Sequence, residues 1–105
     1  MKTVSIYGIP FTIQVKSTVH EVGHDIDEEM PLMGEICFMS HSINIIDSNK
    51  PRMLRVLLHE IIHGIVEEGH IARMFGKDGR HDEDAVDQLA VGLAIALESL
   101  GVTEL

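Results

Sequence analysis

Apolar and polar residues alternate near the start of the chain, as they do in half-buried β-strands. Between Thr3 and Lys16 the alternating apolar positions are Val4, Ile6, Phe11, Ile13 and Val15. Gly8-Ile9-Pro10 interrupts this alternation. Because glycine and proline together favour a break, the segment is either a hairpin or a single bent strand.

The segment from Gly34 to Asp47 has a second alternating pattern, and we interpret it as a β-hairpin. Its apolar positions are Ile36 and Phe38, followed by Ile43, Ile45 and Ile46. Ser40-His41-Ser42 separates the two runs and is typical of a turn. Asp47-Ser48-Asn49-Lys50 then leads out of the predicted sheet.

From Pro51 to Glu68 the apolar spacing changes to that of a helix. Pro51 suits a first helical position, Ser48 or Asn49 can cap the helix, and Gly69 suits a position just after its end. The apolar residues share one wide arc that begins about 160° round the helix from His59. They are Leu54, Leu57, Leu58, Ile61, Ile62 and Ile65.

A second helix is predicted from Glu83 to Leu100, with Asp82 as its cap and Gly101 just after its end. The segment from His70 to His81 between the helices has the composition of a loop. Together these patterns predict an α+β fold in which a small, mainly antiparallel sheet packs on two helices. With 105 residues, the chain from 1 to 105 is expected to form one domain.

Charge and cysteine content narrow the classes of function. The 17 acidic and 8 basic residues give a formal net charge of −9, which argues against nucleic acid as a partner. Cys37 is the only cysteine, so the chain has no internal disulfide, which fits a reducing compartment. We find no signal peptide and no apolar run of membrane-spanning length, and therefore predict a cytoplasmic protein without a membrane partner.

His59-Glu60-Ile61-Ile62-His63 is an H-E-x-x-H motif within the first predicted helix. His59 and His63 are four residues apart, so both side chains can reach one metal ion, and imidazole nitrogen suits zinc. Glu60 lies about 100° further round, where its carboxylate can act on a water at the metal without being a ligand. Such a carboxylate is a candidate general base.

A second H-E-x-x-H occurs at His20-Glu21-Val22-Gly23-His24. Its surroundings lack a helical apolar pattern, and Gly23 and Pro31 disfavour a long helix there. We therefore expect that His20 and His24 are not metal ligands.

The second predicted helix offers the third ligand that a catalytic zinc site usually has. Glu83 and Asp87 are four residues apart, on a face that continues into Val86, Ala90, Ala94 and Leu97. We predict Glu83 as the ligand, and interpret Asp82 and Asp84 as acids that complement the helix dipole. His41, His70 and His81 are weaker candidates.

His59, Glu60 and His63, followed by Glu83 and Asp87, resemble the gluzincin metallopeptidases typified by thermolysin. The resemblance implies that Glu83 completes a zinc site and that Asp87 supports a ligand histidine. The small size and the run from Glu83 to Ala90 are similar to the compact ImmA/IrrE-type metallopeptidases, common in phages and mobile elements. Their usual asparagine is Asp87 here. This resemblance implies a minimal zincin-like fold and cleavage of a protein target, often a repressor.

The function predicted from these observations is zinc-dependent hydrolysis of peptide bonds in a protein substrate, with Glu60 as general base. One alternative is a non-catalytic, zinc-containing binding or regulatory protein that retains the site. A metal-free globular protein is a third interpretation. The residue that stabilises the oxyanion stays open among His41, His70, Arg80 and His81.

Overall fold

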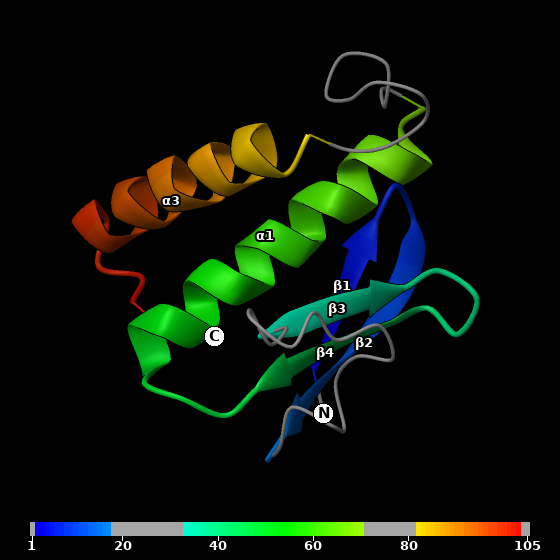
Figure 1. Ribbon diagram of the computed structural model, residues 1–105, viewed down its shortest axis with the longest axis horizontal. Helices are drawn as coiled ribbons and strands as arrows, with labels where there is room; N and C mark the ends of the chain where they lie inside the picture. The colour runs from blue at the N-terminus through cyan, green and yellow to red at the C-terminus, as the bar shows by residue number, and fades with distance from the viewer. Residues whose placement is uncertain (1, 18–32, 71–81, 104–105) are drawn as a thin grey trace.

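The computed structural model describes residues 2–17, 33–70 and 82–103, which form four strands and two helices (Figure 1). In chain order the elements are β1 (Lys2–Ile6), β2 (Ile9–Lys16), β3 (Gly34–Cys37), β4 (Ser42–Ile46), α1 (Lys50–Glu68) and α3 (Glu83–Ser99). The predicted α+β class is confirmed.

The four strands form one mixed sheet in the order β1-β2-β4-β3. The pairings β1–β2 and β3–β4 are antiparallel, as predicted, whereas β2 and β4 pair in parallel at the centre. The first alternating segment is a hairpin rather than a bent strand. Tyr7 and Gly8 form its turn with φ angles of 50° and 82°, the conformation of two-residue hairpin turns, and Pro10 lies within β2 instead of in the break.

Both helices begin at predicted caps. The Asn49 side chain accepts a hydrogen bond from the Arg52 backbone N–H at 3.0 Å, and Asp82 accepts one from Ala85 N–H at 3.1 Å. Gly101 follows α3 with φ of 87°, as a glycine after a helix end does.

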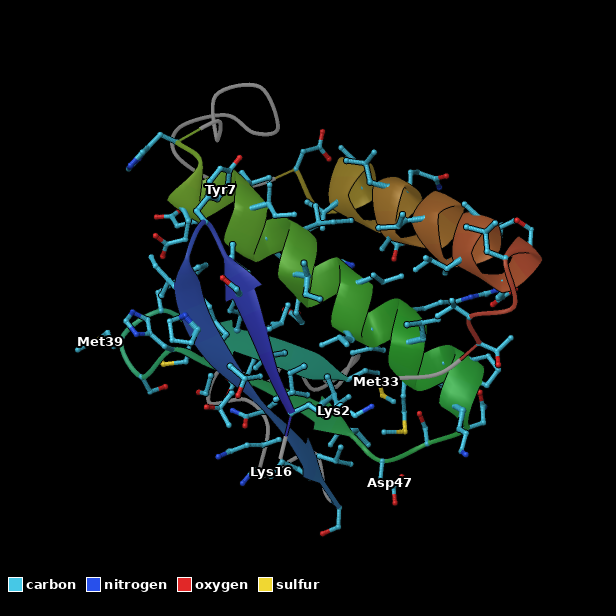
Figure 2. The ribbon with its side chains drawn as sticks, turned by 180° about the vertical axis from the view of Figure 1, so that it is seen from behind. Lys2, Tyr7, Lys16, Met33, Met39 and Asp47 are labelled. Atoms are coloured by element: carbon cyan, nitrogen blue, oxygen red, sulfur yellow. The ribbon has the colours of Figure 1, made fainter. Side chains whose placement is uncertain are left out.

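Gly69 differs from its prediction. It is the last capping residue of α1 with φ of −83°, and His70 takes the left-handed conformation with φ of 55°. Glycine is needed at position 69 for space, because an added Cβ would lie 2.7 Å from the Ile65 carbonyl oxygen and 2.9 Å from the Tyr7 hydroxyl. Figure 2 shows Tyr7, at the tip of the β1–β2 hairpin, beside this end of α1.

Helix α1 is the middle layer of the molecule, with the sheet on one side and α3 on the other (Figure 1). Toward α3 it presents Leu54, Leu58, Ile62 and Val66, which pack on Val86, Ala90, Ala94 and Leu97. Toward the sheet it presents Met53, Val56, Leu57 and Ile61, which pack around Phe11, Ile13, Ile43 and Ile45. The helix therefore has two apolar faces, and the predicted single arc covers only part of them.

Two glycines let α1 approach the sheet closely. A Cβ added at Gly34 in β3 would lie 2.6 Å from Val56 Cγ1 and 3.3 Å from the Asn44 carbonyl oxygen. A Cβ added at Gly64 in α1 would lie 2.6 Å from Ile6 Cδ1. Real Cβ atoms do not approach this closely, so a side chain at either position would force a neighbouring side chain or the helix to shift.

Candidate metal centre

His59 and His63 lie on the strip of α1 that separates its two apolar faces. Their side chains are 23% and 12% exposed, and their rings meet edge to face with centroids 4.9 Å apart. Because they are one helical turn apart, both Nε2 atoms point to the same place and lie 3.2 Å from each other. The geometry therefore confirms the prediction that the two histidines of the H-E-x-x-H motif lie on one face of the helix.

Glu83 brings its carboxylate to the two histidines from the first turn of α3. Its Oε2 lies 3.0 Å from His59 Nε2, and its Oε1 lies 3.1 Å from His63 Nε2. The α1–α3 packing described above sets this approach, because Val86 and Ala90 follow Glu83 on the buried side of α3. The structure thus brings together the three predicted ligands.

The spacing of these donor atoms fits a tetrahedral metal ion. Zinc–nitrogen and zinc–oxygen bonds of about 2.0–2.1 Å in a tetrahedron require ligand atoms roughly 3.3 Å apart. The triangle formed by His59 Nε2, His63 Nε2 and Glu83 Oε2 has sides of 3.2 Å, 3.0 Å and 3.3 Å. Two neutral imidazoles and one carboxylate are also a donor set that zinc prefers, so the residues present fit a zinc ion.

Asp87 lies one turn after Glu83 and faces the other ring nitrogen of His59. Its Oδ1 is 3.5 Å from His59 Nδ1. A carboxylate beside Nδ1 favours a proton on that nitrogen, which leaves Nε2 free to bind a metal. This position agrees with the predicted supporting role.

Glu60 is buried between α1 and β3, with 7% of its surface exposed. Its Cγ lies 3.4 Å from the place that a Cβ on Gly34 would occupy. The pKa of Glu60 is raised from 4.5 to about 8, first by burial and then by the negative charges of Glu83 and Glu35. The Glu60 carboxyl is therefore near enough to Glu83 for the two charges to interact.

Glu35 is a contributor that the sequence did not indicate. It lies in β3 and accepts a hydrogen bond from Asn44 Nδ2 at 3.1 Å, while its charge acts on Glu60. An acidic residue in an alternating strand ordinarily indicates a solvent-facing position, so sequence alone gave no reason to connect Glu35 with the motif.

Two of the weaker histidine candidates, His41 and His70, do not join the cluster. His41 lies in the turn between β3 and β4, where its ring packs on Phe11 at 5.3 Å, and His70 follows the end of α1. Among the described residues, the metal-binding arrangement comprises His59, His63 and Glu83. His20, His24, Arg80 and His81 lie outside the described residues.

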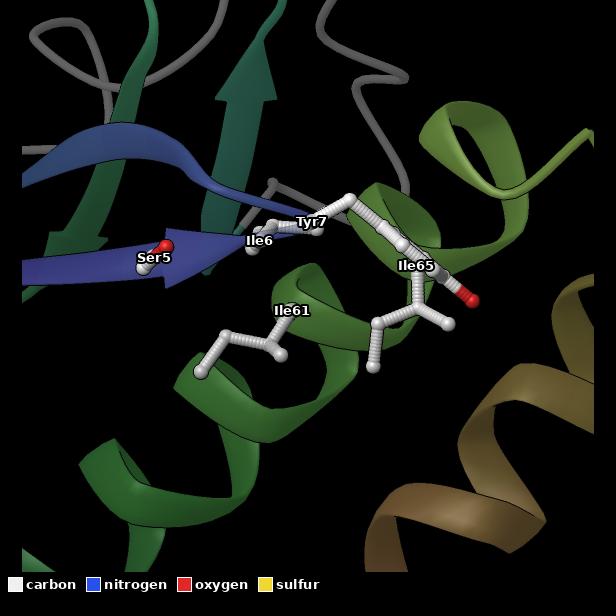
Figure 3. A pocket seen from close by; sticks show the side chains of 5 residues that line it. All are labelled: Ser5, Ile6, Tyr7, Ile61 and Ile65. Atoms are coloured by element: carbon white, nitrogen blue, oxygen red, sulfur yellow. The ribbon is translucent and has the colours of Figure 1, made fainter.

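A pocket of about 250 Å³ lies on the opposite side of α1, lined by Ser5, Ile6, Tyr7, Ile61 and Ile65 (Figure 3). Ile61 and Ile65 are about 200–240° round α1 from His59, so the pocket is separate from the metal-binding arrangement. Its lining is mainly apolar and lacks the convergent polar groups of a catalytic site.

Comparisons with known protein families, curated proteins and solved structures find no match to this chain. Neither helix in the described part of the chain combines the length and apolar character needed to cross a membrane. The candidate function therefore depends on the residues and on their geometry.

Proposed function

We propose that the chain is a zinc-dependent peptidase whose metal ligands are His59, His63 and Glu83. The observation that carries this proposal is the triangle of donor atoms, with sides of 3.0–3.3 Å, formed by two helices that meet at this point. A solvent-exposed ion pair would not need a second histidine at the same distance from the same carboxylate.

Glu60 is the general base of the proposed reaction. A zinc ion held by the three ligands would act as a Lewis acid toward the scissile carbonyl and the attacking water. The Glu60 carboxylate takes a proton from that water and then delivers it to the leaving amine. A nearby cation would lower the pKa of Glu60 from about 8 and so favour the base form near neutral pH.

The substrate class that fits this site is an extended peptide segment. Strand β3 is at the edge of the sheet and pairs only with β4 among the described residues, and it runs past Glu60 at Gly34. A peptide that pairs with such an edge would run along the Glu60 side of α1. We propose a protein partner, with repressor-like proteins as the first class to assay, in a cytoplasmic setting without nucleic acid or membrane.

The decisive experiment compares wild type, Glu60→Gln and Glu68→Gln in zinc analysis and in cleavage of a peptide library and of repressor-like proteins. Glu68 lies on the same helix outside the site, so Glu68→Gln is the matched control. We expect all three to hold zinc, and Glu60→Gln alone to lose activity by ~10²–10⁴-fold.

Equal cleavage by wild type and Glu60→Gln would disprove the mechanism. If none of the three cleaves anything while all hold zinc through four protein ligands, the alternative of a non-catalytic zinc-containing regulatory protein would replace the proposal.

A further inference from the structure

Helix α3, with its C-cap residue Leu100, carries a stripe of uncharged residues that its packing on α1 does not use and that is exposed except at the half-buried Ala85. In order the stripe residues are Ala85, Leu89, Gly92, Leu93, Ala96 and Leu100. Leu89, Leu93 and Leu100 are 45%, 44% and 79% exposed. The stripe lies about 100° round α3 from the buried residues Val86, Ala90 and Ala94, on the flank away from Glu83 and Asp87.

Gly92 in this stripe has no explanation within the described chain. A glycine inside a helix costs about 0.5–1 kcal/mol relative to alanine. Yet a Cβ added at Gly92 would meet nothing within 4 Å. Unlike Gly34 and Gly64, it is not required by a neighbouring element, so an opening in the surface is left at the middle of the stripe.

The stripe is complementary to itself in the antiparallel direction. Its spacings are 4, 3, 1, 3 and 4 residues, which read the same from either end. A two-fold axis between positions 92 and 93 therefore sets each large residue against a small one. The pairs are Leu100 with Ala85, Leu89 with Ala96, and Leu93 with Gly92. In a two-fold interface each pair occurs twice.

From this self-complementarity we infer that the chain forms a two-fold dimer in which the two α3 helices cross at Gly92. Alternating large and small residues across the axis let the side chains interdigitate, and the absence of a side chain at Gly92 lets the helices approach closely. The antiparallel arrangement also places opposite ends of the helix dipoles together.

Charge and area are consistent with a second copy as the partner. The formal net charge of −9 disfavours contact between two copies over most of the surface, but the stripe contains no ionisable side chain. Its three leucines expose on the order of 300 Å² of apolar surface, the centre of an interface that needs about 800 Å² per partner. Glu83 and Asp87 are on the other flank of α3, so the dimer leaves the metal-binding arrangement open.

Sedimentation equilibrium of the full chain, with and without a chelator, tests this inference. We expect a mass twice the 11.7 kDa of one chain in both conditions. Because the contact is apolar and the chains repel each other, added salt should strengthen the dimer. A wild-type protein that stays at 11.7 kDa at about 100 μM would overturn the inference.

An exchange of one predicted pair tests the register. Leu89→Ala leaves a cavity and Ala96→Leu overfills the opposing position, each twice per dimer, so each should raise the dimer Kd by on the order of 100-fold. The double variant restores one large and one small residue in each pair and should recover to within ~10-fold of wild type. A double variant no tighter than the single variants would reject this register.

Two further variants separate association from folding. Gly92→Leu raises helix propensity, so it should keep the monomer fold while filling the crossing point and abolishing the dimer. Ile95→Ala removes an apolar side chain that is 55% exposed on α3 outside the stripe, and should leave the dimer Kd unchanged. A dimer that survives Gly92→Leu, or that Ile95→Ala weakens equally, would contradict the interface.

Discussion

The two long sides of the α1–α3 pair differ in chemistry although the same two helices form both. One side, here called the polar side, gathers His59, His63, Glu83 and Asp87 within 3.5 Å contacts. The other, the apolar side, carries the pocket at Ile61 and Ile65 and the exposed leucines of α3. The buried faces between the helices hold the two sides in a fixed relation, so each can be changed separately.

The difference is explained by helical spacing. Residues 59 and 63 are one turn apart, as are residues 61 and 65, but a shift of two positions moves a side chain about 200° round the helix. Residues 59 and 63 therefore lie on one side and residues 61 and 65 on the other, and a substitution on one side has a matched control two positions away.

The largest effect is expected on the zinc content of the variant His63→Ala. Loss of one of three ligands should reduce bound zinc from about one ion per chain to near zero, because the remaining pair cannot complete a tetrahedral site. Elemental mass spectrometry of the purified protein measures this, and circular dichroism checks the fold.

Two controls accompany His63→Ala. Ile65→Ala, on the apolar side, and the double change His20→Ala with His24→Ala should both keep zinc. Full zinc occupancy in His63→Ala would show that His63 is not a metal ligand. Loss of zinc in the folded double variant would show that His20 and His24 bind the metal instead.

An intermediate effect, on the free energy of unfolding, is expected for Gly34→Ala. This substitution acts on the spacing between β3 and α1, the helix that carries His59 and His63. The added Cβ would lie 2.6 Å from Val56 Cγ1, so the Val56 side chain or α1 itself must shift. Overpacking of this kind costs about 1–3 kcal/mol of unfolding free energy. Urea denaturation measures it.

The matched control for Gly34→Ala is Gly92→Ala, the same substitution where a Cβ meets nothing within 4 Å. It should raise monomer stability by about 0.5–1 kcal/mol. If Gly34→Ala is as stable as wild type, the close approach of α1 to β3 at Gly34 does not hold Glu60 in its position.

The smallest effect, taken per pH unit, is a pH dependence of the metal-free protein that Glu60 provides. Between 4.5 and about 8 the folded chain keeps a proton on Glu60 that the unfolded chain has released. Unfolding free energy therefore falls as pH rises through this window, by at most ~1.4 kcal/mol per pH unit. Urea denaturation across the window, with Glu60→Gln for comparison, measures the contribution.

Glu60→Gln should show a flatter dependence on pH than wild type, since glutamine does not titrate. Identical slopes for the two proteins would mean that Glu60 is not held in its buried position.

Local signals predicted much of the fold and of the candidate site. Alternation located the strands, Asn49 and Asp82 cap the helices, and the four-residue spacing put His59 and His63 on one face. The approach of Glu83 followed from its alignment with the buried face of α3. Each of these features depends on a few neighbouring residues, so sequence spacing is enough to predict it.

Features set by distant contacts were not predictable in the same way. The parallel pairing of β2 with β4 joins segments far apart in the chain, and nothing in either segment specifies its partner. Met53 and Val56 on the sheet-facing side of α1 were left out of the predicted arc, because spacing along one helix does not show that a second layer covers that side. The influence of Glu35 on Glu60 likewise needed the position of β3.

The parallel β2–β4 pairing has a consequence for the order in which the molecule folds. Each hairpin closes a short loop, whereas the β2–β4 contact must close the whole interval between Lys16 and Ser42, at a larger cost in chain entropy. We expect the hairpins to form early and to join late, with α1 docking once β1, β3 and β4 are together. The donor atoms on α1 and α3 converge through the α1–α3 packing, so metal uptake would report that contact and not the late joining of the hairpins.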